Sequence, residues 1–240
     1  MTISGTHAVI AALQNGIRGE LYVYSKHQKI EELYTFAEKK ICTIHPVTRE
    51  YCKKHAIRQN IQLKIKNSPL TQVQKLSTWL QDTKDIDKLL VLIIDHIHDA
   101  QNLGAIFRSS ALFSVDLLIL PKRRVAPIND AGIRSASGAI TLVPTCTVSN
   151  VHSALRELKD YGFWNYALDA RGSSSYTAEL SKRSAFILGN EAKGLHELVS
   201  RKSDFLLSIP SSGAVDSFNA SVSLAIICYE YRRQHPLLQK

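Results

Sequence analysis

The second half of the chain contains short apolar runs separated by polar segments with helical spacing. The clearest run is Leu89–Ile94, six aliphatic residues with no polar residue between them. Such a run predicts a strand buried on both faces, which is typical of a parallel sheet. Because further runs alternate with helical patterns, we predict an α/β domain with a mostly parallel sheet. The further predicted strands are Asp116–Leu120, Thr141–Val143, Phe163–Leu168, Ala185–Leu188 and Phe205–Ile209.

The first part of the chain has a pattern of its own. Thr6–Gln14 is predicted to be a helix that ends at Gly16, and Glu20–Tyr24 alternates as a half-buried strand does. Ile30–Lys40 places its apolar residues at helical spacing. These elements predict a small α/β unit over residues 1–66. Its remaining elements are an apolar stretch at Ile41–Ile44, a helix at Val47–Lys54 and a strand at Ile61–Ile65.

Residues 67–87 are polar and carry no strand signal. We interpret them as a linker with one helical segment around Thr71–Gln81. The predicted organisation is therefore a small domain over 1–66, a linker over 67–87 and a larger domain over 88–240. A chain of 240 residues has room for one large and one small domain.

Composition narrows the class of protein. The chain is 45% hydrophobic and 21% charged, which excludes disorder, collagen and coiled coil as its main state. The longest aliphatic run has six residues, so no segment is expected to span a bilayer, and no signal peptide is visible. None of the four cysteines lies in a CxxC motif, which argues against a disulfide framework and a zinc knuckle. We expect a cytoplasmic protein with no membrane partner.

Charge is distributed unevenly along the chain. Residues 1–75 carry 12 Lys and Arg against 5 Asp and Glu, whereas residues 76–240 carry 18 against 16. A basic domain beside a near-neutral one favours a polyanionic partner, most often nucleic acid. A solvated basic surface and a membrane surface are the alternatives.

Several common catalytic signatures are absent. The sequence has no GxGxxG and no GxSxG motif. Gly189 and Gly194 have the glycine spacing of a P-loop, but Leu195 stands where the lysine should be. His96, His98 and Asp99 follow a predicted strand, yet no further ligand follows at a supporting spacing. We therefore expect no metal.

Three polar, glycine-bearing segments follow predicted strands: Asp95–Arg108, Ile187–Leu195 and Ile209–Ser221. Taken singly, their residues could be only helix caps, turns or surface ion-pair partners. Taken together, they place polar loops at the carboxyl ends of three strands of one sheet, where open α/β sheets bind ligands.

Two helices are expected to begin in these segments. Asn102 can cap the first helix, and it reaches a pocket shared with Arg108 only if it lies just outside that helix. The second helix is expected from near Ser217 to about Arg233. We predict that its buried face carries Val222, Ala225, Ile226 and Tyr229.

The same three segments resemble the three motifs of the SpoU (TrmH-like) branch of the SPOUT RNA methyltransferases. That pattern is Asn-x-Gly-x-x-x-Arg, Leu-Gly-Asn-Glu-x-x-Gly-Leu and Ile-Pro-Met-x-Gly-x-x-x-Ser-Leu-Asn-Val-Ser. Order and spacing agree over residues 89–233. The motifs stand here as Asn102-Leu-Gly104-Ala-Ile-Phe-Arg108, Leu188-Gly189-Asn190-Glu191-Ala-Lys-Gly194-Leu195 and Ile209-Pro210-Ser-Ser-Gly213-Ala-Val-Asp-Ser217-Phe218-Asn219-Ala-Ser221.

The start of the chain, Ser4-Gly-Thr-His7-Ala-Val9, resembles the opening of the small RNA-binding (L30e-like) domain of RlmB-like ribosomal RNA methyltransferases. The chain also departs from the family pattern. Ser211, Phe218 and Ala220 replace Met, Leu and Val, changes that alter the shape of an apolar pocket more than its chemistry. Ala100 replaces a frequent Pro, and Arg58-Gln59-Asn60-Ile61 stands where many RlmB-like members carry His-Gln-Gly-Ile.

The resemblance implies a fold, a cofactor and an assembly. The fold is an α/β domain with a deep trefoil knot, formed by the loops at Gly189–Gly194 and Ile209–Asn219. The cofactor is S-adenosyl-L-methionine, held through the backbone of Gly189, Ile209 and Phe218. The family resemblance further implies a homodimer whose active site is completed across the interface.

The implied reaction is methyl transfer to a ribose 2′-hydroxyl of 23S ribosomal RNA, with a guanosine as the expected target. The matched catalytic positions are Asn102, Arg108, Glu191, Ser217 and Asn219. A guanidinium is a poor base at neutral pH, so we favour Arg108 as the group that holds the target phosphate and stabilises the forming alkoxide. A tRNA ribose methyltransferase and a non-catalytic RNA-binding protein are the alternatives.

Overall fold

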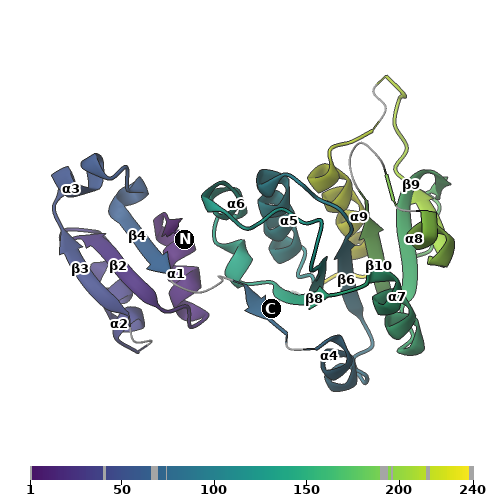
Figure 1. Ribbon diagram of the computed structural model, residues 1–240, viewed down its shortest axis with the longest axis horizontal. Helices are drawn as coiled ribbons and strands as arrows, with labels where there is room; N and C mark the ends of the chain where they lie inside the picture. Colours follow the sequence, from purple (N-terminus) through teal and green to yellow (C-terminus); the bar gives the residue numbers. More distant parts are fainter. Residues whose placement is uncertain are drawn as a thin grey trace.

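The computed structural model describes residues 2–39, 42–65, 70–73, 75–189, 194–195, 197–214 and 217–237. Its strands form two sheets, one from the first 65 residues and one from the remainder (Figure 1). Across the described residues, every helix is too short or too polar to span a bilayer. All four cysteines are free thiols.

The first sheet has four strands in the order β1-β4-β2-β3, with β2 and β3 parallel and the other pairs antiparallel. Its helices confirm the predictions for Thr6–Gln14 and for the segment that begins at Ile30. The predicted helix Val47–Lys54 starts later, because Val47 ends a strand and Thr48 caps the helix. The elements are β1 (Thr2–Ser4), α1 (Thr6–Gln14), β2 (Gly19–Tyr24), α2 (Ile30–Lys39), β3 (Thr43–Val47), α3 (Arg49–Lys54) and β4 (Ile61–Ile65).

The second sheet has seven strands in the order β11-β9-β10-β6-β7-β8-β5, and every neighbouring pair is parallel. This confirms the predicted mostly parallel sheet. Its strands are β5 (Thr71–Gln72), β6 (Leu89–Ile94), β7 (Leu117–Pro121), β8 (Pro144–Val148), β9 (Trp164–Ser174), β10 (Arg183–Leu188) and β11 (Phe205–Ser208).

Helices cover both faces of the second sheet, which explains the continuous apolar run of β6. Leu90, Leu92 and Ile94 pack into one core, and Leu89, Val91 and Ile93 pack into the other. One face carries α5 (Ala100–Leu112), α6 (Asp130–Ala136) and α9 (Ala220–Gln234), and the other carries α4 (Leu76–Asp82), α7 (Val151–Asp160) and α8 (Glu197–Lys202).

One predicted strand was wrong, and the helical segment expected within residues 67–87 is present as α4. The strand expected at Thr141–Val143 is a 3₁₀ turn over Ala139–Thr141, because the Thr141 hydroxyl donates to the Gly138 carbonyl oxygen at 3.0 Å and closes the turn. The strand follows at β8. The segment 67–87 is also more than a linker, because Thr71–Gln72 pairs with β8 and Leu76 and Leu80 of α4 are buried.

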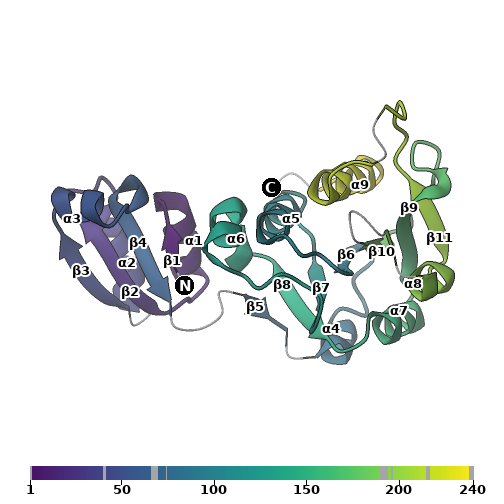
Figure 2. The same cartoon turned by 45° about the horizontal axis from the view of Figure 1, so that its top comes forward.

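The two sheet units pack against each other through α6, which lies between them in Figure 2. Gly138 approaches α1 so closely that a Cβ there would lie 2.6 Å from the Cα of Ala8. The amide of Thr2 donates to Asp130 across the same contact at 3.3 Å. Buried residues of both units therefore form one continuous core.

The buried face of α9 differs from the predicted one. Leu224, Ile227, Cys228 and Tyr231 face the sheet and are at most 1% exposed. Val222 and Tyr229 are instead 44% and 62% exposed, and Ala225 and Ile226 are half-buried. The helix carries two apolar stripes. The stripe with Leu224 and Ile227 packs against the sheet, whereas the prediction had chosen the stripe with Val222 and Tyr229.

Candidate active site

A cavity of about 750 Å³ opens at the carboxyl ends of β9, β10 and β11, beside the start of α9. It collects the three residues predicted to hold the cofactor, Gly189, Ile209 and Phe218, together with the predicted catalytic residue Ser217. These four residues come from the segments that follow β10 and β11, two strands that only β9 separates in the sheet. The lining is completed by Leu168, Asp169, Ala170, Arg171, Leu188, Gly194, Leu195, Leu207, Ser208, Pro210, Ser211, Ala220 and Ser223.

Gly189 directly follows β10, at a point of close backbone contact. A Cβ at this position would lie 2.5 Å from the Gly194 carbonyl oxygen and 2.6 Å from the Leu195 amide nitrogen. The glycine is required because the returning loop occupies the space of a side chain, which brings bare backbone to the cavity wall. The contact, rather than a positive φ, sets this requirement.

The cavity has an apolar wall and a small polar margin. The wall is formed by leucines and Ile209, and the ring of Phe218, 39% exposed, stands at its edge. Asp169 lies at the margin with its side chain 11% exposed, paired with Arg171 through two hydrogen bonds of 2.9 and 2.7 Å. The Arg171 guanidinium holds the pKa of Asp169 below its usual value. The carboxylate is therefore ionised at neutral pH.

Asp169 and Arg171 were missed by the sequence analysis. The available signal was positional, because Asp169 directly follows the predicted strand Phe163–Leu168, as the three chosen segments follow theirs. The strand itself continues to Ser174, so these two residues lie within β9. Gly172 and the three serines after it were a further signal of a turn or loop beside these residues that the prediction did not use.

Two predicted catalytic residues, Asn102 and Asn219, are in contact. The Asn219 Nδ2 donates to Asn102 Oδ1 at 3.1 Å, while Asn219 Oδ1 accepts from the Ser221 amide at 2.9 Å. Asn219 is thus the N-cap of α9, which begins later than expected and leaves Ser217 outside the helix. The contact joins the start of α5 to the start of α9.

Asn102 is not the cap of α5. Asp99 accepts hydrogen bonds from the amides of Gln101 and Asn102 at 3.0 and 3.2 Å, and the helix begins at Ala100. A carboxylate is an equally good cap and adds a favourable interaction with the helix dipole. Asn102 therefore lies inside the first turn, and its side chain is available to Asn219.

Arg108 stands apart from the cavity. It is exposed on α5, about 9 Å along the helix axis from Asn102. Neither Arg108, Asn102 nor Asn219 is among the cavity-lining residues. The predicted catalytic residue Glu191 lies outside the described residues, as does Asn190. Within the described ranges, no three His, Cys, Asp or Glu side chains are grouped to hold a metal ion.

Comparison with known proteins gives this geometry a context. The SpoU rRNA Methylase family model matches residues 89–229, which include all the residues discussed in this section. The chain is also 37% identical over 218 residues to an uncharacterized tRNA/rRNA methyltransferase of Borreliella burgdorferi, covering 89% of this chain and 96% of that protein. This chain belongs to the SpoU rRNA methylase family.

Solved structures agree with that membership at the level of the fold. An S-adenosylmethionine-bound rRNA methyltransferase from Sinorhizobium meliloti superposes with a TM-score of 0.77 at 22% identity, covering 99% of this chain and 88% of that one. A structure concerned with 2′-OH methylation of C/U34 on tRNA superposes with a TM-score of 0.56 at 26% identity. The superposed region covers 97% of that chain but only 62% of this SpoU protein. The predicted cofactor is thus the one used in this family, and the chain is an RNA methyltransferase of the SpoU/TrmH type.

Proposed function

We propose that this protein transfers a methyl group from S-adenosylmethionine to a ribose 2′-hydroxyl of 23S ribosomal RNA, at a guanosine. One observation carries the proposal: Gly189, Ile209, Phe218 and Ser217 line a single cavity at the carboxyl edge of the parallel sheet. Ligands of open α/β sheets bind at this edge. We also propose that the protein acts in the cytoplasm.

The cavity suits the cofactor in shape and chemistry. Its volume of about 750 Å³ is in the range of small-molecule sites, which are mostly apolar with a few polar groups. The leucines and Ile209 provide a slot for adenine, and Asp169 provides an acceptor for a ribose hydroxyl. When bound, the sulfonium supplies the electrophilic methyl group. The trefoil knot implied by the resemblance would involve the loops that line this cavity, and it stays a prediction.

The residues of this chain would position the 2′-oxygen to attack the methyl carbon as the C–S bond breaks, and the proton of the 2′-hydroxyl would pass to solvent. Arg108 would hold the target phosphate and stabilise the forming alkoxide, since a guanidinium offers a planar fork of donors. The hydrogen-bonded pair Asn102 and Asn219 would orient the ribose, and Ser217 would do so from the cavity itself. Glu191 is proposed to orient the loops or to pair with Arg108. Correct positioning alone can lower the barrier by several kcal/mol.

A homodimer would bring Arg108 to the cavity. Arg108 is exposed and outside the cavity of its own chain, and Val222 and Tyr229 leave an apolar stripe uncovered on the neighbouring helix α9. An uncovered apolar stripe on a helix is a common interface between subunits. We therefore propose that a second copy covers α9 and contributes its Arg108 to the site.

The basic first unit is proposed to bind the RNA. The whole chain aligns with the rRNA methyltransferase of S. meliloti, whereas the tRNA-related structure leaves more than a third of this chain unmatched. Ribosomal RNA is for this reason preferred over tRNA.

The test is a map of ribose methylation in total RNA from cells with and without the gene. The expected result is one guanosine of 23S RNA that loses its 2′-O-methyl group. Loss of a ribose methyl group from tRNA would replace rRNA as the substrate. If no ribose methyl group is lost from any RNA, the protein does not carry out this reaction.

A further inference from the structure

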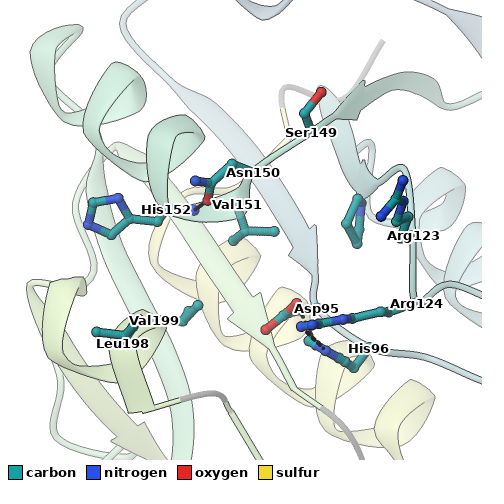
Figure 3. A pocket seen from close by; sticks show the side chains of 11 residues that line it. Asp95, His96, Arg123, Arg124, Ser149, Asn150, Val151, His152, Leu198 and Val199 are labelled. Carbon is teal, nitrogen blue, oxygen red and sulfur yellow. Dashed lines mark hydrogen bonds and ion pairs between the residues drawn. The ribbon is translucent and has the colours of Figure 1, made fainter.

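A second cavity, of about 320 Å³, opens on the same edge of the parallel sheet, at the carboxyl ends of β6, β7 and β8 (Figure 3). The start of α7 and the helix α8 complete its wall. Among the described residues, it shares no lining residue with the cavity proposed for the cofactor. In the strand order, β10 ends at the first cavity and its neighbour β6 ends at the second, so the two lie along one edge.

One wall of this cavity is cationic. It carries Arg123 and Arg124, which follow β7, while the start of α7 adds the positive end of a helix dipole from across the cavity. Arg123 is exposed, and no described residue forms an ion pair with it. Its donors are therefore available to an anion from outside.

Arg124 is held in place by a chain of polar contacts. Its Nη1 lies 2.8 Å from His96 Nε2, and His96 Nδ1 lies 2.6 Å from Asp95 Oδ1, as drawn in Figure 3. A guanidinium can only donate, so Nε2 accepts and Nδ1 carries the hydrogen donated to the buried carboxylate of Asp95. One donor of Arg124 is fixed in this way and the rest of the fork remains for a ligand.

The backbone at this wall is strained and braced. His96 and Arg124 have φ of 65° and 71°, a left-handed conformation that costs roughly 1–2 kcal/mol for a residue with a side chain. Directly after them, Ile97 and Val125 form a parallel bridge, and the Ala126 amide donates to the Ile97 carbonyl oxygen at 2.6 Å. Strained backbone persists only where surrounding contacts hold it, and in proteins it is concentrated at active sites and ligand-binding sites.

The opposite wall is mostly apolar. Val151 and Val199 line it beside His152, and Leu198 is 58% exposed at its rim. A ligand that suits both walls has an anionic group at one end and a flat apolar group at the other. A nucleotide of an RNA strand has this composition, with a phosphate for the arginines and a base for the leucine and His152.

We propose that this cavity binds a nucleotide of the RNA substrate that neighbours the methylated one, with its phosphate on Arg123 and Arg124 and its base against Leu198. The inference rests on the proposed function, because it takes RNA as the substrate. The cavity would fix the register of the strand while the target ribose lies at the first cavity.

The experiment measures binding of deproteinised 23S RNA to the full-length protein over a range of salt concentrations. Arg123→Glu is the main variant because Arg123 holds no described partner, so its loss should leave the fold intact. We expect RNA affinity to fall about tenfold, as for a lost charge-assisted hydrogen bond. The slope of log affinity against log salt should fall by about 0.7 for a single-strand contact. Arg156→Glu, an exposed arginine of α7 outside the cavity, is the matched control.

A second variant separates the two walls. Leu198→Ser should weaken RNA binding several-fold without changing the salt slope, because a base contact releases no counterions. S-adenosylmethionine affinity, measured by calorimetry, should remain at the wild-type value in all three variants and shows that each is folded. RNA binding by Arg123→Glu equal to that of Arg156→Glu would overturn the proposal.

Failure of this inference is distinguishable from failure of the proposed function. Phosphate contacts are independent of sequence, so the binding assay does not require that 23S RNA contain the methylated nucleotide. Should Arg123→Glu weaken RNA binding while no ribose methylation is found in cells, the cavity stands as an RNA site and the reaction is wrong.

Discussion

The two sheets of this protein differ in how many of their faces are covered by helices. In β2 of the first sheet, Leu21 and Val23 are buried, while Tyr22 between them reaches the opposite face. In β6 of the second sheet, all six residues are buried because helices cover both faces. A sheet with one accessible face can bind a partner across its surface, whereas a sheet covered on both faces offers only its edge.

The accessible face of the first sheet carries an aromatic and basic cluster. The rings of Tyr22 and His45 stack at 4.6 Å, and Lys64 Nζ lies 4.3 Å from the Tyr22 ring centroid. The α3 residue Tyr51 lies parallel to Tyr22 at 6.2 Å and contacts His55 at 4.2 Å. Rings beside cations are the groups that bind unpaired bases and phosphates. We therefore propose that RNA binds the accessible face of the first sheet, whereas the cofactor site is proposed at the edge of the second sheet.

The sharpest test of this division concerns Arg108, which is proposed to act on RNA although it belongs to the second unit. Arg108→Ala is expected to lower methyl transfer by orders of magnitude and to leave cofactor affinity near the wild-type value. Arg108→Lys should restore little, because lysine keeps the charge but lacks the planar fork. The measurements are transfer of labelled methyl groups to 23S RNA and calorimetry with S-adenosylmethionine. Turnover by Arg108→Ala near that of wild type would contradict the assignment.

The cofactor side of the comparison depends on Gly189. In Gly189→Val the new side chain would meet the Gly194 carbonyl oxygen and displace the loop, so cofactor binding should be lost and RNA binding retained. Gly162→Val is the control, since Gly162 has φ of 80° and only Arg183 near its Cβ position, at 4.0 Å. That variant should lose stability but still bind S-adenosylmethionine. Wild-type cofactor affinity in Gly189→Val would remove this glycine from the site.

The proposed dimer would bring Arg108 of one copy to the cofactor cavity of the other, and charges on the exposed face of α9 should disrupt it. The double variant Val222→Glu and Tyr229→Glu should sediment as a monomer, and its methyl transfer should fall by tenfold or more. The matched control is Ile86→Glu, which changes an apolar side chain of similar exposure (46%) away from α9. A dimer that persists in the double variant would exclude this face as the interface.

The smallest expected effect concerns the face of the first sheet. Changing Tyr22 to Ala and Lys64 to Glu together should weaken RNA binding by roughly tenfold, the scale of one lost base stack, with no change in cofactor affinity. Lys26→Glu, on an exposed turn of the same unit, tests whether charge alone is responsible. If the double variant and Lys26→Glu lose the same RNA affinity, the unit attracts RNA by its overall charge and not by this face. Point variants are used here and not a deletion of residues 1–65, because a deletion would expose the core that the two units share.

The sequence alone determined the parallel sheet and the loops that carry chemistry. Runs such as Leu89–Ile94 are local signals of burial on both faces, and glycines at bends are local signals of backbone contact. The motif segments around Gly189 and Ser217 were therefore placed at the strand ends from the sequence, and the structure brings them to one cavity.

Tertiary structure decided the features for which the sequence offered two alternatives. Both Asp99 and Asn102 are residue types that can cap α5. In the structure Asp99 is the cap, and the Asn102 side chain contacts Asn219 instead. Helix α9 has two apolar stripes, and the sheet buried the one that contains Leu224. Only part of the second cavity had a sequence signal, because Asp95 and His96 belong to a predicted polar segment, whereas its other residues end or follow β7, follow β8 or belong to α7 and α8. Local patterns record which side chains prefer burial, but the order of strands in a sheet determines which loop ends become neighbours.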